Sequence, residues 1–266
     1  MTLGKEYRLF IWNSALSYLA ERADMELVRQ HMSLPEVSRP EHFSDVYLRF
    51  LKSLANRQGM PRTIGEVERL APVFCDFDHQ RTLQRYRTGW ETLFDVIRET
   101  VRPSSRMDKD NPHSYWVIFC KGSISGASYL ARFHSLDQLL QFIRDFDEKP
   151  STRPALPLLI GYEVFGYGFP LACDFLKELG FSNYSKPDTH LIDIFSGLGI
   201  SSNSPLDVFR TVSLMACEVG ETPFAIDKAF WLIGSGKLYL RNVRFKTDKR
   251  EFIETVKSNW QAPGSN

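Results

Sequence analysis

The sequence predicts an all-α fold with at most a minor β element. Apolar residues recur at three- and four-residue intervals along almost the whole chain, which is the spacing of one face of a helix. Signals for helix starts and ends flank many of these segments. Candidate strands are confined to two short runs, residues 115–119 and 238–245, and either run is also compatible with a helix or a loop.

The clearest single helix lies between Pro40 and Gly59, where an apolar face extends from Phe43 to Leu54. Comparable periodicity predicts further helices at about 9–20, 79–100, 136–146, 155–164, 169–179, 189–198, 205–219 and 223–233. Two serines predict helix starts and three glycines predict helix ends: Ser135, Ser204 followed by Pro205, Gly180, Gly199 and Gly234.

The composition indicates an ordered, soluble protein with one large core or two lobes. The chain has 266 residues, of which 43% are hydrophobic and 24% charged, and its net charge is only +1. This balance lacks the basicity typical of many nucleic-acid-binding proteins, so any phosphate-binding surface must be local. Basic residues gather at 81–109 and at 237–250, where six of them oppose Asp248 alone. A solvated face is the alternative, and we favour it for each cluster taken separately, because runs of charge alone are weak evidence.

Neither cofactors nor a membrane are indicated. Four separated cysteines form no close pair, so the sequence predicts buried, reduced thiols and no metal or iron–sulfur site: Cys75, Cys120, Cys173 and Cys217. The apolar stretch at 9–20 is interrupted by polar residues and resembles neither a signal peptide nor a membrane span. We expect a monomer in the cytoplasm, associated with the nucleoid if the protein is bacterial.

One stretch combines a phosphate-binding turn with a carboxylate. Phe165-Gly166-Tyr167-Gly168 precedes an apolar helix, and Asp188-Thr189-His190 follows 20 residues after Gly168. A Gly-x-Gly turn lets the backbone approach another molecule, and the free N–H groups at the start of the next helix attract phosphate. Asp188 is expected at another helix start, where the dipole favours an ionised carboxylate. A plain N-cap is the alternative role for this residue.

These residues resemble the helix-hairpin-helix DNA glycosylase superfamily, which includes endonuclease III and the alkyl-base glycosylases. The likeness covers residues 155–200: a helix, the hairpin at 165–168, a helix with the small residue Ala172, a short loop, and Asp188-Thr189-His190. It implies two helical lobes with a cleft between them, and double-stranded DNA with a flipped nucleotide as the partner. The expected lobes are 75–184, ending in the hairpin, and 1–74 with 185–266, which carries the aspartate.

The resemblance also implies roles for individual residues. Asp188 would be the catalytic carboxylate that stabilises the sugar cation and activates water. Five residues would bind DNA phosphates: Gly166, Tyr167, Gly168, Lys186 and His190. Three aromatic residues would flank the base pocket: Tyr115, Trp116 and Phe119. The competing interpretations are a structural histidine at 190 and core packing for the aromatic residues, and we favour both of these.

One departure from the family narrows the chemistry. Family members that also cut the strand have a lysine two positions after the second hairpin glycine, where this chain has Pro170. The likeness therefore implies a monofunctional glycosylase that leaves an abasic site, in DNA repair or in defence against modified phage DNA. Two other interpretations remain: a helix-hairpin-helix DNA-binding module without catalysis, and a helical interaction protein that binds no nucleic acid.

Overall fold

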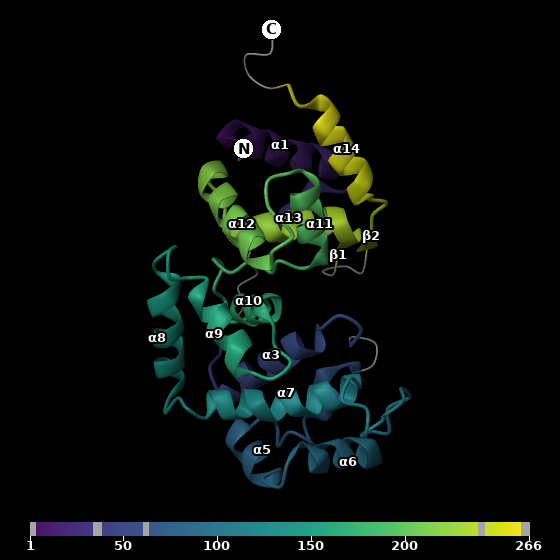
Figure 1. The fold of residues 1–266 in the computed structure, drawn as a ribbon, viewed down its shortest axis with the longest axis vertical. Coiled ribbons are helices and arrows are strands. Elements are labelled where there is room, and N and C mark those ends of the chain that lie inside the picture. The colour runs from purple at the N-terminus through teal and green to yellow at the C-terminus, as the bar shows by residue number, and fades with distance from the viewer. Residues whose placement is uncertain (1–3, 34–38, 61–63, 239–242, 262–266) are drawn as a thin grey trace. The chain divides into compact units, whose positions relative to one another are not determined.

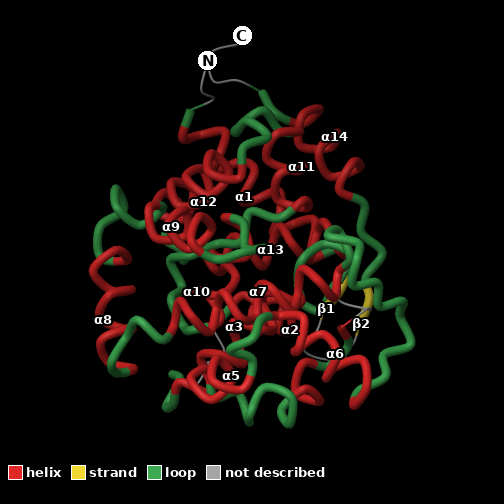
Figure 2. Tube along the Cα trace, turned by 60° about the horizontal axis from the view of Figure 1, so that its bottom comes forward, coloured by secondary structure: helices red, strands yellow, loops and turns green. Residues whose placement is uncertain are grey.

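The computed structural model describes residues 4–33, 39–60, 64–238 and 243–261, and it confirms the all-α prediction (Figure 1, Figure 2). Among these residues the only strands are β1 (Lys237–Leu238) and β2 (Val243–Arg244), which pair antiparallel with Lys237 opposite Arg244. They fall at the second run predicted as a possible strand, whose residues 239–242 lie outside the described part. The first run, 115–119, is instead the beginning of helix α7 (Tyr115–Leu130).

The chain forms two compact units, one of Met1–Val37 with Gly180–Asn266 and one of Ser38–Leu179. We call them the terminal unit and the central unit. These boundaries differ from the expected ones at 74/75 and 184/185. The physical reason is helix α3 (Phe43–Ala55), which packs against α7 and α10 (Phe169–Glu178) of the central unit. Its Phe50 ring stacks on Tyr167 with centroids 4.4 Å apart.

Helix α7 is the centre of the central unit and packs against α3, α5 (His79–Arg85) and α6 (Trp90–Thr100) (Figure 1). Its Gly126 permits the close approach of α3, because an added Cβ would lie 2.1 Å from Cε1 of Phe50. The segment predicted as one helix at 79–100 is broken at Gly89, which has a φ of +129° and caps α6. The remaining elements of this unit are η1 (Val67–Leu70), α8 (Leu136–Asp147) and α9 (Ala155–Glu163).

In the terminal unit, α13 (Pro223–Ser235) packs against the following helices: α1 (Lys5–Ala20), α2 (Met25–Met32), α11 (Thr189–Gly197) and α12 (Pro205–Val219). It ends at Gly236, with a φ of +64°, rather than at the predicted Gly234, which lies inside the helix. The unit also contains α14 (Lys249–Asn259). The periodicity analysis did not predict α2 or α14.

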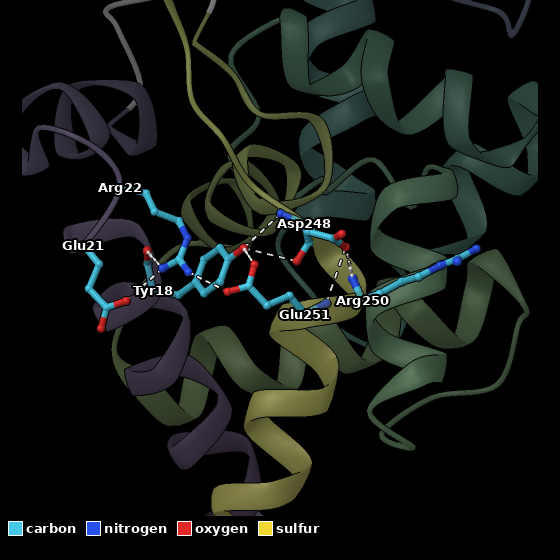
Figure 3. Close-up of polar contacts among 6 residues, drawn as sticks. All are labelled: Tyr18, Glu21, Arg22, Asp248, Arg250 and Glu251. Atoms are coloured by element: carbon cyan, nitrogen blue, oxygen red, sulfur yellow. Dashed lines mark hydrogen bonds and ion pairs between the residues drawn. The ribbon is translucent and has the colours of Figure 1, made fainter.

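A polar cluster joins α1 to the start of α14 (Figure 3). The Tyr18 hydroxyl accepts the N–H of Asp248 at 2.9 Å and lies 3.2 Å from the carbonyl oxygen of the same residue. Arg22 stacks over the Tyr18 ring and pairs with Glu251 at 2.7 Å. The first and last described helices of the chain are therefore fastened to one core.

The four cysteines are free thiols, but their burial differs from the prediction. Cys120 and Cys173 are buried, Cys75 is half-buried and Cys217 is exposed. Within the described ranges, no helix has both the length and the apolar composition needed to cross a bilayer.

Candidate nucleic-acid interface and carboxylate site

The Gly-x-Gly segment forms a tight turn between α9 and α10 in the central unit. Gly166 has a φ of +76°, and an added Cβ would lie 3.1 Å from Cγ2 of Ile118. Gly168 is extended and is the N-cap of α10, where its carbonyl accepts the N–H groups of Leu171 and Ala172. The left-handed backbone at position 166 therefore favours glycine, whereas the extended backbone at position 168 is only compatible with it. The chain reverses direction within these four residues.

Two hydrogen bonds from neighbouring segments hold the turn. Nη1 of Arg57 donates to the carbonyl oxygen of Gly166 at 2.8 Å. The N–H of Phe165 donates to Oγ of Ser125 on α7 at 2.9 Å. In the described part of the chain, no hydrogen bond uses the amide N–H of Gly166 or Gly168, and Gly168 is exposed. These two amides are the N–H groups that the turn leaves available to a ligand.

Tyr167 does not fit its predicted role as a phosphate ligand. Its side chain is only 5% exposed, stacks on Phe50 and donates its hydroxyl to the Phe50 carbonyl at 2.7 Å. Its amide N–H donates to the carbonyl of Val164 at 3.2 Å, inside the turn. Both polar groups of the residue thus serve the fold, because the hairpin needs an anchor in the core of the central unit.

Two exposed aromatic residues and a half-buried lysine lie at or near the turn, and none of them was predicted as a site residue. Phe165 is 48% exposed and Tyr162 is 90% exposed. The ammonium group of Lys121 lies 5.6 Å from the ring centroid of Phe165 and 4.8 Å from that of Trp90. Phe165 could have been selected from its position directly before Gly166, whereas Lys121 is brought there only by the packing of α7.

Asp188 begins α11 in the terminal unit and is its N-cap. Its Oδ1 accepts the N–H groups of His190 at 2.9 Å and Leu191 at 3.2 Å. No hydrogen bond among the described residues uses the second carboxylate oxygen, Oδ2. The half-buried carboxylate thus has the capping role weighed above and still has one oxygen available for a substrate or a water molecule.

The electrostatic surroundings raise the pKa of Asp188 above its ordinary value. Burial is the largest cause, and the negative charge of Asp227 adds to it. The positive charges of Lys186 and His190 and the N–H of Leu191 act in the opposite direction. Asp227 lies on α13, is 2% exposed, and accepts the backbone N–H of Lys186 through Oδ2 at 2.8 Å.

Lys186 and His190 flank Asp188 and contribute differently. Lys186 is half-buried, and its backbone is fixed by Asp227. His190 packs edge-on to Trp231 and against Gly234, where an added Cβ would meet the histidine Cβ at 2.6 Å. Its Nδ1 is buried without a hydrogen-bond partner in the described residues. The structural interpretation of His190 therefore explains its position better than a phosphate contact does.

Two of the three predicted pocket aromatics belong to the core of the central unit. Trp116 is 1% exposed and donates its Nε1–H to Oγ of Ser105 at 2.9 Å, and Phe119 is fully buried. They have no exposed ring face on which a base could stack. Tyr115, at the start of α7, is exposed. Core packing, the alternative considered from the sequence, accounts for Trp116 and Phe119.

The hairpin thus belongs to the central unit and Asp188 to the terminal unit, whose second segment begins at Gly180. Comparisons with protein-family models, curated proteins and solved structures find no match to this chain. Any function must therefore be inferred from the hairpin residues and from Asp188 with its neighbours.

Proposed function

We propose that the protein is a monofunctional DNA glycosylase, which rotates a damaged or modified base out of the duplex and hydrolyses its N-glycosidic bond. The observation that carries this proposal is the half-buried carboxylate of Asp188. One of its oxygens is held at the start of α11, and the chain connects it through α10 and a short loop to a Gly-x-Gly turn with available amides. The family resemblance given above motivates the same pairing of groups.

The hairpin would bind the sugar–phosphate backbone of DNA. Amide N–H groups at a helix start bind phosphate through hydrogen bonds and through the positive end of the helix dipole. Lys121 and the exposed ring of Phe165, beside the turn, suit the charged and apolar parts of a sugar–phosphate backbone. Such contacts bind many sequences equally, because phosphates carry no sequence information.

Asp188 would carry the chemistry. Cleavage of an N-glycosidic bond develops positive charge on the sugar, which a nearby ionised carboxylate stabilises. The same group can orient or deprotonate the attacking water, and Oδ2 is the oxygen that remains for this purpose. Only the ionised form performs either task, so activity should fall at acidic pH as Asp188 is protonated.

Pro170 supports hydrolysis rather than strand cleavage. It lies at the second position of α10, where it contributes no amine. A Schiff base with the sugar needs an amine nucleophile at the site, and the corresponding lysine of strand-cutting relatives is absent from this position. The expected product is an intact strand with an abasic site.

The test uses duplexes that each contain one oxidised, alkylated, deaminated or hypermodified base, followed by hot alkali to cut abasic sites. We expect cleavage of at least one substrate after alkali and none before it. Asp188→Asn should reduce the rate by at least about 100-fold, in line with the loss of a general base or a charge stabiliser. Asp193→Asn is the matched control on the same helix, since Asp193 pairs with Lys249 on the surface, and it should retain activity.

A helix-hairpin-helix module that binds DNA without catalysis is the second candidate, because the N-cap bonds of Asp188 give it a sufficient structural role. This candidate predicts a steep loss of duplex affinity with salt and no abasic product from any substrate. A protein that binds no nucleic acid would show neither. The glycosylase proposal fails if Asp188→Asn forms abasic sites as fast as the wild type.

A further inference from the structure

We propose that Asp227 is a positioning residue for Asp188: its buried carboxylate fixes the turn that presents Asp188 and sets the electrostatic field at the catalytic group. This inference deepens the proposed glycosylase function and rests on it. All of the residues involved lie in the terminal unit, on α13, on α11 and in the loop that precedes α11.

A continuous series of hydrogen bonds connects the two carboxylates. Oδ2 of Asp227 accepts the N–H of Lys186 at 2.8 Å, and the carbonyl of Lys186 accepts the N–H of Asp188 at 2.8 Å. Asp188 in turn caps α11. The loop before α11 is thereby fastened to α13, which itself packs on α11. The position of Asp188 consequently depends on a residue 39 positions further along the chain.

The charge of Asp227 reaches beyond its hydrogen bond to the Lys186 N–H. Asp227 is only 2% exposed, so water screens its carboxylate poorly. In such a site a charge acts over a longer distance than a hydrogen bond does. Asp188 is a group on which the charge of Asp227 acts.

The effect on catalysis follows from the charges around Asp188. Asp227 from α13 and burial raise the pKa of Asp188, whereas Lys186 from the loop and His190 from α11 lower it. A carboxylate with a raised pKa is a stronger base toward the attacking water. The same shift moves the acidic limb of the pH–rate profile upward. Removal of the Asp227 charge should reverse both effects.

Asp227→Asn separates the charge from the hydrogen bond, because the amide oxygen can still accept the Lys186 N–H. In single-turnover assays on the substrate found in the base panel, we expect the acidic limb to move to lower pH and the plateau rate to fall several-fold. Duplex affinity should change less than about twofold, as the variant leaves the hairpin intact. Asp227→Glu keeps the charge and should keep the acidic limb, with a reduced rate from the displaced turn. Asp193→Asn is again the control.

A direct titration makes the inference independent of activity. In wild-type protein with ¹³C-labelled aspartate, the Asp188 carboxyl, assigned by its loss in Asp188→Asn, should titrate above its ordinary value of about 3.9. In Asp227→Asn the same carboxyl should titrate at lower pH than in the wild type, because the negative charge of Asp227 raises the pKa of Asp188. A single transition at the ordinary value overturns the inference even if Asp227→Asn does not fold. An unchanged acidic limb in a folded, active Asp227→Asn variant overturns it as well.

Failure of the glycosylase proposal looks different. In that case the wild type forms no abasic site from any substrate at any pH, while the pKa of Asp188 is still raised and is lowered by Asp227→Asn. This pKa shift without activity rejects the catalytic role and keeps the electrostatic effect of Asp227 on Asp188, whereas activity without the shift rejects only the role of Asp227.

Discussion

The guanidinium of Arg57 donates a hydrogen bond to the carbonyl oxygen of Gly166, with Nη1 and the oxygen 2.8 Å apart. Arg57 follows the C-cap of α3, so the bond joins that helix to the one hairpin residue with a left-handed backbone. The peptide plane that contains this carbonyl also contains the Tyr167 N–H, which donates to the Val164 carbonyl inside the turn. The order of the Gly-x-Gly turn therefore depends on a cation outside the motif.

Replacement of Arg57 by methionine should loosen the hairpin while the central unit stays folded. Methionine keeps much of the apolar stem and removes the donor, which costs about 1 kcal/mol or somewhat more for a charged group. We expect faster hydrogen exchange at the Gly166 and Gly168 amides and a weaker affinity for duplex DNA. Arg49→Met is the matched control, because Arg49 donates to the Glu178 carbonyl at the other end of α10 at 3.0 Å. Equal exchange at the turn in both variants would refute the role assigned to Arg57.

The two hairpin glycines should respond differently to alanine. Gly166→Ala forces a side chain into a left-handed backbone beside Ile118 and should destabilise the protein by about 1–2 kcal/mol. At Gly168 the backbone is extended and the nearest atom to an added Cβ is Cδ of Pro170, 3.8 Å away. Gly168→Ala should therefore change stability by less than about 1 kcal/mol, the range for an N-cap replacement.

The same two variants should rank in the opposite order when duplex affinity is measured: Gly168→Ala should weaken DNA binding more than Gly166→Ala does. The added methyl group of Gly168→Ala stands on the exposed side of the turn, where a phosphate must approach, and should reduce duplex affinity about tenfold or more. Urea unfolding and fluorescence anisotropy at one fixed salt concentration measure the two effects. Wild-type affinity in Gly168→Ala would mean that these amides do not contact DNA.

The hairpin and the start of α11 could be predicted from the sequence because local chemistry determines both. Gly166 requires a left-handed backbone, and Asp188 caps the next helix through N–H groups two and three residues away. The same holds for α8, whose N-cap Ser135 accepts the N–H of Gln138 at 3.1 Å. Hydrogen bonds between residues only two or three positions apart can be predicted from a single sequence.

Other features depend on distant partners and could not be predicted in this way. Residues 115–119 are aromatic and β-branched enough for a buried strand, and they become helical because α7 packs against three other helices. Asp227 accepts the N–H of Lys186, which is 41 positions away in the chain. No local sequence pattern predicts this hydrogen bond. Tyr167 was misassigned for the same reason, since Phe50 is 117 positions away from it.

Tyr18→Phe should destabilise the terminal unit without affecting the hairpin. The variant removes the hydroxyl that accepts the Asp248 N–H at 2.9 Å, and a donor left without its partner costs about 1–3 kcal/mol (Figure 3). Urea unfolding of the variant, followed by circular dichroism, should show an earlier transition. Tyr162→Phe is the control, because the side chain of Tyr162 is almost fully exposed, and its unfolding curve should match that of the wild type. If the unfolding curve of Tyr18→Phe also matches that of the wild type, the polar cluster between α1 and α14 has no stabilising role.

Asp188→Asn should abolish catalysis and yet stabilise the protein at neutral pH. The pKa of Asp188 is raised in the folded state, so folding favours the protonated carboxyl. The protonated carboxyl therefore increases the free energy of unfolding. This contribution is complete below the ordinary pKa of about 3.9 and is lost as pH rises through the raised pKa of the folded state. Above that pH the ionised group lowers the free energy of unfolding. Asparagine carries no charge and is an equally good N-cap, so it removes only the cost.

The difference in unfolding free energy between Asp188→Asn and wild type should therefore grow between about pH 4 and pH 7. Urea unfolding at several pH values in this range measures it, with Asp193→Asn as the control. Asp193 is a surface residue paired with Lys249, and its variant should show no comparable gain toward neutral pH. If Asp188→Asn is less stable than wild type at pH 7, the carboxylate contributes more through its cap bonds to His190 and Leu191 than its burial costs. The raised pKa of Asp188 would then be wrong, and so would the proposal that this carboxylate is a stronger base toward the attacking water.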